Sequence, residues 1–277
     1  MKTGDMASQE IIDAKLDELA LVVGADGVML SFRSNGGSPK GGITWRKAKI
    51  GILARMGPRL DRHGRQVTHI AARWLVATLG STDDLVVRLR VEGLRQPVGR
   101  AMHFAWVNGR ARVMWRASAE LFTDEVIRLI DFYHAAAHLW KSAEALIAYR
   151  DSALIRIATA RHSSDHGGAG DIIADLARAV AQTVCGPKRS AVLSQVHHYF
   201  DRHSEHLRFP DDSGAGLRRS SGLVASTCKR VFQKRFKGVG MRWSEDGSNL
   251  PFLLLPAWVN DRFDSLVQLR SAPSPNS

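Results

Sequence analysis

Residues 19–32 read LALVVGADGVMLSF, and the interpretation of this stretch decides how the rest of the chain is assigned. Residues 19–23 are apolar and predict a strand that ends at Gly24. Asp26 and Gly27 have the composition of a tight turn, so residues 28–32 are expected to form a strand paired with the first. Asp26 therefore has two open interpretations: a turn residue, or a carboxylate placed at the end of a buried strand to do chemistry.

Strand and helix patterns follow one another through the rest of the first half. Residues 45–54 alternate apolar and polar side chains with the period of two that is typical of a strand. Ser81 or Thr82 is a candidate N-cap, followed by acids that favour a helix start. Further strands are expected at 68–77, 103–108 and 126–130, and helices at 80–96 and 115–122. This order predicts the α/β class, with an RNase H-like mixed sheet, a helical insertion and C-terminal helices.

Helical patterns dominate the second half. A long helix is expected after Asp131, with a buried face formed by Phe132, Ala136, Leu139, Ala143 and Leu146. Other helices are expected at 171–184, at 190–207 and at 222–237. The predicted units are the RNase H-like core with the first helices (1–150), a helical insertion (151–213), a C-terminal helical part with a basic segment (214–267) and a disordered tail (268–277).

Charge indicates the class of partner. The chain has 39 Lys and Arg against 27 Asp and Glu, a formal net charge of +12, with a sequence pI of about 10.3. A polyanion such as nucleic acid is the natural counterpart, although a protein that is merely basic is the alternative.

Residues 213–244 contain no acid and concentrate the positive charge. A solvated helix face normally mixes signs, so DNA binding is favoured over that alternative. Phe236 and Trp243 could stack on bases, and both also fit a core role. The basic residues are Arg218, Arg219, Lys229, Arg230, Lys234, Arg235, Lys237 and Arg242.

The remaining composition argues against a secreted or membrane protein. Two cysteines, Cys185 and Cys228, are too few for a disulfide framework. The first ten residues lack the apolar core of a signal peptide, and the apolar run at 250–259 is short and contains prolines. We expect a soluble, cytoplasmic protein.

Histidine spacing gives only a weak indication of a metal site. His134 and His138 lie four residues apart, a spacing that can hold a metal, but the three residues between them are all Ala, so a structural role is favoured. His162 and His166 are weaker candidates in a polar loop. A two-metal RNase H-like site instead needs carboxylates from the first strand, the end of the fourth strand and a late helix, and Asp26 suits the first.

Several segments together resemble the ISKra-type insertion-sequence transposases, which are relatives of the Mutator-like DDE transposases. The segments are ADGVMLSFR (25–33), WRKAKIGILAR (45–55), LIDFYHAAAHLW (129–140), SSGLVASTCKRVFQKRFKGVGMRWSEDGS (220–248) and NDRFDSL (260–266). The resemblance implies an RNase H-like fold, a metal-dependent mechanism with Mg²⁺ or Mn²⁺, and double-stranded DNA at the element ends as the substrate. It also implies nucleoid association, and it leaves a homo-oligomer open.

Aligning the family's three catalytic acids with this sequence implies an impaired catalytic site. Asp26 matches the first acid, Asn108 stands at the second position, and Ala225 stands where the family's "VES" segment has Glu. One carboxylate facing two dications predicts poor metal occupancy. Two alternatives stay open: a compensating acid (Asp83, Asp131 or Glu245), and a domesticated DNA-binding protein without catalysis. The family also carries a region before its first catalytic strand, so a truncated element copy is expected.

Overall fold

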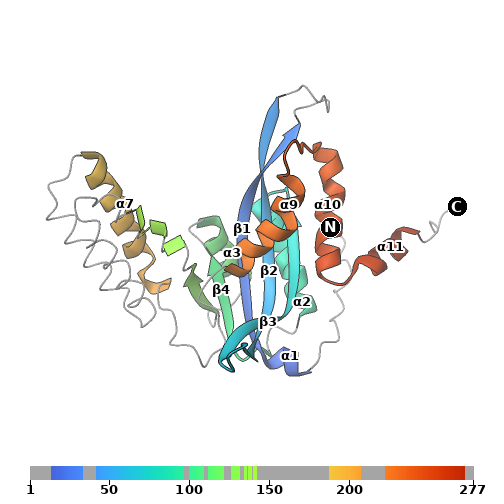
Figure 1. Ribbon diagram of the computed structural model, residues 1–277, viewed down its shortest axis with the longest axis horizontal. Coiled ribbons are helices and arrows are strands. Elements are labelled where there is room, and N and C mark those ends of the chain that lie inside the picture. Colours follow the sequence, from blue (N-terminus) through green and yellow to red (C-terminus); the bar gives the residue numbers. More distant parts are fainter. Residues whose placement is uncertain are drawn as a thin grey trace.

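A five-stranded mixed sheet with the strand order β3-β2-β1-β4-β5 forms the centre of the computed structural model (Figure 1). β1 pairs antiparallel with β2 and β2 with β3, whereas β4 runs parallel to β1 and β5 parallel to β4. The strands are β1 (Ala20–Arg33), β2 (Ile43–Leu60), β3 (Gln66–Thr78), β4 (Phe104–Asn108) and β5 (Ile127–Ile130). The described residues are 14–33, 42–96, 100–108, 112–121, 126–131, 134–135, 137–138, 140–141, 187–206 and 222–271.

This order of strands and helices is α/β and is consistent with the expected RNase H-like fold. The strands expected at 45–54, 68–77, 103–108 and 126–130 are confirmed, and β2 and β3 are longer than the patterns indicated. The helices α2 (Thr82–Arg95) and α3 (Arg112–Leu121) are confirmed as well. Ser81 is the N-cap of α2, where its side chain and that of Asp84 form a reciprocal capping box.

The turn predicted at Asp26 and Gly27 is wrong. β1 is one strand of 14 residues that runs straight through both residues, and Asp26 pairs in register with Ile50 of β2. Gly27 makes no turn, and the atoms nearest to it across the sheet face belong to the flexible Lys47 side chain. A Cβ added there would fall 2.2 Å from Cε of Lys47, whose side chain crosses this point.

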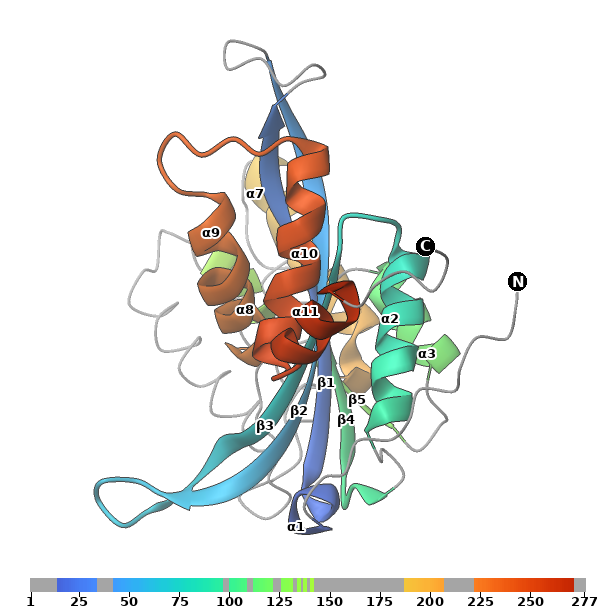
Figure 2. The same cartoon turned by 90° about the vertical axis from the view of Figure 1, so that its right-hand side faces the viewer.

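Two hydrophobic cores cover the two faces of the sheet. Val22, Val28 and Leu30 of β1 point to a core shared with helices α8 (Gly222–Thr227), α9 (Lys234–Phe236) and α10 (Glu245–Val259), here called the α8–α10 face. Leu21 and Val23 point to the opposite core, under α2 and α3, here called the α2–α3 face. Figure 2 shows α8 to α11 in front of the sheet and α2 and α3 to one side. This alternation decides which side of the sheet each candidate residue occupies.

The C-terminal helices differ from the prediction. The helix expected at 222–237 begins as α8, continues through a π-helical stretch (Cys228–Gln233) and ends as α9. Two further helices, α10 and α11 (Phe263–Ser271), lie beyond the helix expected at 222–237, and most of their length falls in the region 214–267 that was expected to be helical. The Ser244 side chain caps α10 by accepting a hydrogen bond from the Gly247 amide. α11 extends into the region expected to be a disordered tail.

Part of the second half lies outside the described residues. The expected buried face after Asp131 and the helix at 171–184 fall there, as do Arg218, Arg219, Cys185, His162 and His166. The short helix α1 (Ala14–Glu18) precedes the sheet, and α7 (Pro187–Arg202) and a 3₁₀ turn (Ser204–His206) occupy most of the helix expected at 190–207. In the part of the chain that is described, no helix is both long and apolar enough to cross a membrane.

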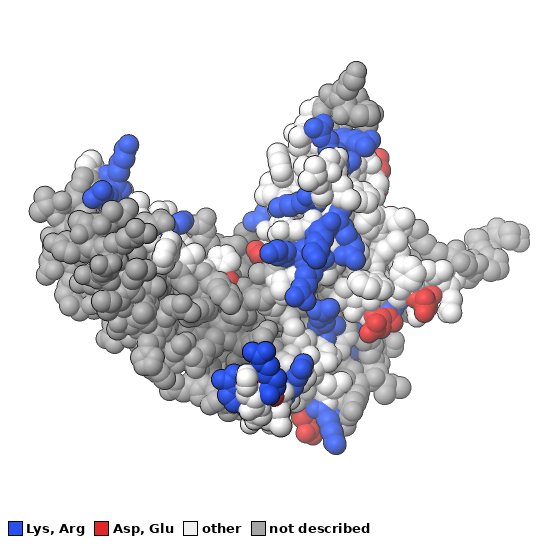
Figure 3. All heavy atoms as spheres, viewed as in Figure 1, with Lys and Arg blue, Asp and Glu red and all other residues white. Residues whose placement is uncertain are grey.

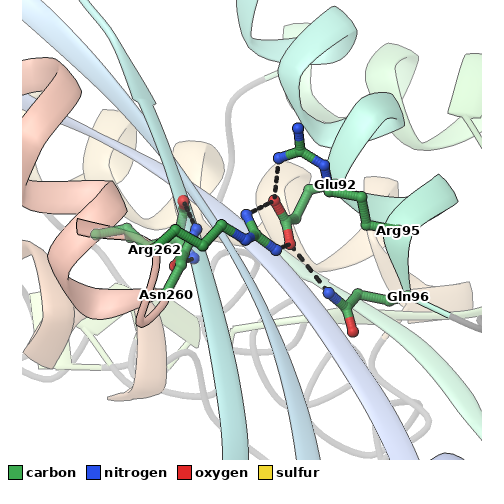
Figure 4. A network of polar contacts seen from close by, with 6 residues as sticks. Glu92, Arg95, Gln96, Asn260 and Arg262 are labelled. Carbon is green, nitrogen blue, oxygen red and sulfur yellow. Dashed lines mark hydrogen bonds and ion pairs between the residues drawn. The ribbon is translucent and has the colours of Figure 1, made fainter. Parts of the chain in front are cut away.

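A polar clamp ties the C-terminal helices to the edge of the sheet. The Asn260 side chain accepts from the backbone N–H of Leu75 (2.6 Å) and donates to its carbonyl (3.0 Å), so it pairs with β3 as another strand would. Arg262 donates two hydrogen bonds of 2.7 Å to the carboxylate of Glu92 on α2, which is 2% exposed (Figure 4). Gln96 donates a further bond to Glu92. The clamp joins elements from opposite faces of the sheet around its β3 edge.

Candidate active site and nucleic-acid interface

Asp26 lies in the middle of β1, on the α8–α10 face. Strand alternation places it with Val22 and Val28, whose side chains lie in the core on that face. The side chain is partly buried, and its Oδ1 accepts a hydrogen bond of 2.7 Å from the Gly27 amide. The carboxylate is therefore held beneath a helical layer rather than exposed at a turn.

α8 reaches this face because Gly24 has no side chain. A Cβ on Gly24 would lie 2.5 Å from Cγ2 of Val224 and 3.1 Å from the carbonyl oxygen of Val107. A methyl group does not fit in that space. Gly24 thus sets how closely α8 approaches β1, two residues before Asp26.

Cys228 begins the π-helical stretch that follows α8, and its thiol feels the charge of Asp26. It is buried, and burial first, then the negative charge of Asp26, raise the pKa of the Cys228 thiol to about 12. Ala225 belongs to α8, which leads directly into the π-helical stretch that begins at Cys228. The structure therefore brings the helix that carries Ala225 to the same face as Asp26.

Asn108 is not brought alongside Asp26. It ends β4, in register with Ala25 of β1, and its side chain is 2% exposed. Val107 belongs to the core on the α8–α10 face and Trp106 to the core on the α2–α3 face, so alternation places Asn108 with Trp106. Its Nδ2 is buried with no hydrogen-bond partner in the described part of the chain. The side chain at the second acid position thus faces away from Asp26.

The other acids that could have compensated have different surroundings. Asp83, in the first turn of α2, forms an ion pair of 2.9 Å with Arg116 on the α2–α3 face. Glu245 begins α10 and lies 2.6 Å from Arg46 of β2. Asp131 follows β5 directly, is 1% exposed, and contacts Nδ1 of His134 at 2.5 Å.

His134 and His138 do not share a contact that would indicate a metal site. His134 contacts Asp131, whereas the ring of His138 stacks on Tyr199 of α7 with a centroid distance of 3.8 Å. Among the residues that the structure describes, no group of three or more His, Cys, Asp or Glu side chains is placed to hold a metal ion. The structural role favoured for this pair agrees with the stacking of His138.

The described side chains around Asp26 do not fit two divalent metals. Magnesium and manganese need several oxygen ligands, and Asp26 offers one carboxylate that already accepts a backbone hydrogen bond. The neighbouring Cys228 offers a soft sulfur atom, whereas magnesium and manganese prefer oxygen ligands. Ala225 supplies no oxygen, and Asn108 belongs to the other face.

A basic surface covers the helix above this site. We call it the α8–α9 basic surface; its members are the exposed residues Lys229, Arg230, Lys234, Arg235, Lys237 and Arg242. Figure 3 shows Lys and Arg gathered in a band where α9 lies, with few acids beside them. The apolar side of the same helix is buried through Val231, Phe232 and Phe236, so the helix is fixed while its charged side faces solvent.

Arg235 also has an intramolecular role. Its guanidinium donates to the carbonyls of Arg230 (3.1 Å) and Val231 (3.2 Å) and lies 5.7 Å from the ring centroid of Trp258. Phe236 is fully buried and Trp243 packs against the same core, so the core role holds for both aromatic residues. Their rings are not part of the charged surface.

The polar clamp was missed by sequence reasoning, although a signal existed. Asn260 and Arg262 belong to the NDRFDSL segment (260–266), but spacing alone did not indicate their partners. These partners, Leu75 and Glu92, lie 185 and 170 residues away in the chain. Glu92 follows Leu85 and Leu89 on the apolar face of α2, and a carboxylate in such a position is the signal that could have suggested a distant cation.

Comparisons with known proteins give little further information. No family model matches the sequence, and no curated protein matches it. A solved structure titled "Drosophila P element transposase strand transfer complex" aligns with 94% of this chain and 67% of its own, at 10% identity and a TM-score of 0.29. A likeness this weak supports no conclusion about fold or function, so the fold assignment rests on the order and pairing of the strands.

Proposed function

We propose that this chain is a DNA-binding protein of the insertion-sequence transposase type, similar to the ISKra group, whose catalytic centre is impaired. The α8–α9 basic surface carries this proposal, because an ordered helix above the Asp26 site presents exposed cations without interleaved acids. The expected partner is double-stranded DNA. Nucleoid association would follow from such binding.

The physical basis of binding is phosphate neutralisation. Each Lys or Arg that contacts a phosphate releases counterions from the DNA. A plot of the logarithm of the binding constant against the logarithm of the salt concentration therefore has a slope of about −0.9 for each contact on duplex DNA. The cations on this surface contact phosphates without reading the bases, and therefore position the duplex across the helix.

The test is fluorescence anisotropy of the full chain with a labelled duplex over about 50 to 200 mM salt. Lys229→Gln with Lys234→Gln should weaken binding and reduce the salt slope by about 2. The matched control is Arg88→Gln with Arg90→Gln, two exposed residues of α2 on the opposite face. Equal losses in both variants would mean that only total charge matters and would contradict the assigned surface.

The impaired centre is proposed from the ligands around Asp26. Ala225→Glu should restore weak Mn²⁺ binding, detected by electron paramagnetic resonance, because it adds a second carboxylate to the helix on that face. Asn108→Asp should add no further binding, since it places its charge on the other face. Metal-dependent cleavage of DNA by the unchanged protein would overturn the proposed impairment.

A domesticated DNA-binding protein without catalysis is the second candidate. The unsuitable ligand set at Asp26 favours it, because the basic surface is kept while the metal site is not. Such a protein should prefer one repeat sequence over unrelated duplexes in competition binding. Indifference to sequence would count against this candidate.

A further inference from the structure

We propose that the far end of the β2–β3 hairpin is a second DNA-contacting element, which inserts as a two-stranded ribbon into a groove of the duplex. This inference rests on the proposed DNA-binding function and extends it to a surface distant in sequence from the α8–α9 helix. The element is residues 57–70, here called the β2–β3 ribbon.

The ribbon extends beyond the sheet. The pairing of β1 with β2 begins at Ala20 opposite Met56, so the ribbon residues of β2 pair with β3 alone, from Gly57 opposite His69 to Leu60 opposite Gln66. Figure 2 shows this hairpin curving away from the body of the molecule. A two-stranded ribbon of this kind fits the major groove of B-form DNA, which is about 12 Å wide.

The base of the ribbon is fixed. The register between β2 and β3 shifts at Arg55 and Met56, a bulge that bends the strand pair where it leaves the sheet. Arg55 is fully buried there and donates to the carbonyls of Asp17 (2.9 Å) and Leu19 (3.0 Å). The ribbon therefore projects from an anchored point in a defined direction.

The tip is also ordered before any partner arrives. Asp61 accepts from the amides of His63 (2.8 Å) and Arg65 (3.0 Å) and from the Arg65 side chain (2.9 Å). These bonds hold the pKa of Asp61 below its usual value, with the Arg65 amide as the largest cause. Gly64 adopts φ +73°, which a glycine accepts without strain.

Positive charge at the tip is suited to phosphates. The ribbon carries Arg59, Arg62 and Arg65 against the single acid Asp61, and the Asp61 carboxylate is turned inward to the loop amides. Leu60 is 66% exposed at the tip, an apolar side chain that can contact thymine methyl groups in the groove. Figure 3 shows a separate group of Lys and Arg in the lower part of the face that also carries the α9 band.

The first test removes charge from the ribbon. Arg59→Gln with Arg62→Gln should raise the Kd for a labelled duplex of roughly three helical turns. At about 100 mM salt, the expected rise is roughly tenfold or more, and the salt slope should fall by about 2. The control is the α2 pair Arg88→Gln with Arg90→Gln, which removes the same charge from the other face. If the ribbon variant changes the Kd and the salt slope no more than this control does, the inference is overturned.

The second test removes the hydrogen bonds that order the tip while it increases the positive charge of the tip. Asp61→Ala makes the tip more positive by one charge but deletes the acceptors that order it. Weaker binding than the unchanged protein supports a pre-shaped ribbon, and tighter binding overturns it in favour of simple charge attraction. Circular dichroism and thermal melting confirm that each variant folds.

The two proposals fail in different ways. If the unchanged protein does not bind duplex DNA, the proposed function fails and the inference with it. If it binds, and only the Lys229 and Lys234 variant weakens binding, the DNA-binding function stands while the ribbon proposal fails. Loss in both variants supports a duplex that spans both elements.

Discussion

At the scale of single residues, Gly24 controls the position of the helix above the site. Gly24→Ala should destabilise the fold by ~1–3 kcal/mol, because the new methyl overlaps Val224 and the Val107 carbonyl. Chemical denaturation measures this cost. Adding Val224→Ala should recover part of the loss in a double-mutant cycle, since it removes the side chain that the methyl meets. Equal effects of Gly24→Ala in both backgrounds would contradict this contact.

Cys228 gives a second residue-scale prediction. Burial raises its pKa in the folded state to about 12, above the usual value of 9.0 for a thiol, so the thiol keeps its proton in the fold after it has ionised in the unfolded chain. The contribution to stability is full below pH 9 and is lost as pH rises toward 12, at about 1.4 kcal/mol per pH unit. Denaturation at pH 8 and pH 10 should therefore show a steeper loss in the unchanged protein than in Cys228→Ala.

At the scale of elements, the polar clamp holds the C-terminal helices on the sheet. Arg262→Ala leaves Glu92 buried without its main partner, and we expect a loss of about 3–5 kcal/mol in denaturant unfolding. Adding Glu92→Gln to Arg262→Ala should recover part of the stability, because the charge that lacks a partner is removed. If the double variant is no more stable than Arg262→Ala, the loss of stability does not come from the unpaired charge of Glu92.

Elements were predictable where local patterns decide them. Alternation located β2, capping residues located the start of α2, and short strand-like segments located β3 and β4. The sequence predicted two strands in place of β1, because Asp26 and Gly27 have the composition of a turn. In the structure, β1 pairs with β2 along its whole length, and this pairing overrides the local turn preference. The bounds of α10 were not predicted within the helical region expected at 214–267; Ser244 is its N-cap, and Pro251 and Pro256 lie inside it.

At the scale of the whole molecule, the candidate site was predictable only in part. Asp26 and the helix of Ala225 were indicated by the family resemblance, and the structure brings the strand and the helix together. The face occupied by Asn108 was not predictable, since it depends on the register between β4 and a strand about 80 residues earlier. The same holds for the projecting ribbon, whose shape follows from where β1 stops pairing with β2.

The clamp between Glu92 and Arg262 also has a consequence for the order in which the chain is made. Their separation of 170 residues means that a ribosome working at about 5–20 residues per second completes Glu92 roughly 10 to 30 s before Arg262. During that interval α2 carries a carboxylate without its cation, and the β3 edge lacks Asn260. Open strand edges pair readily with other chains. The growing polypeptide therefore keeps an open β3 edge until its last helices emerge, and a chaperone that shields this edge would act in that window.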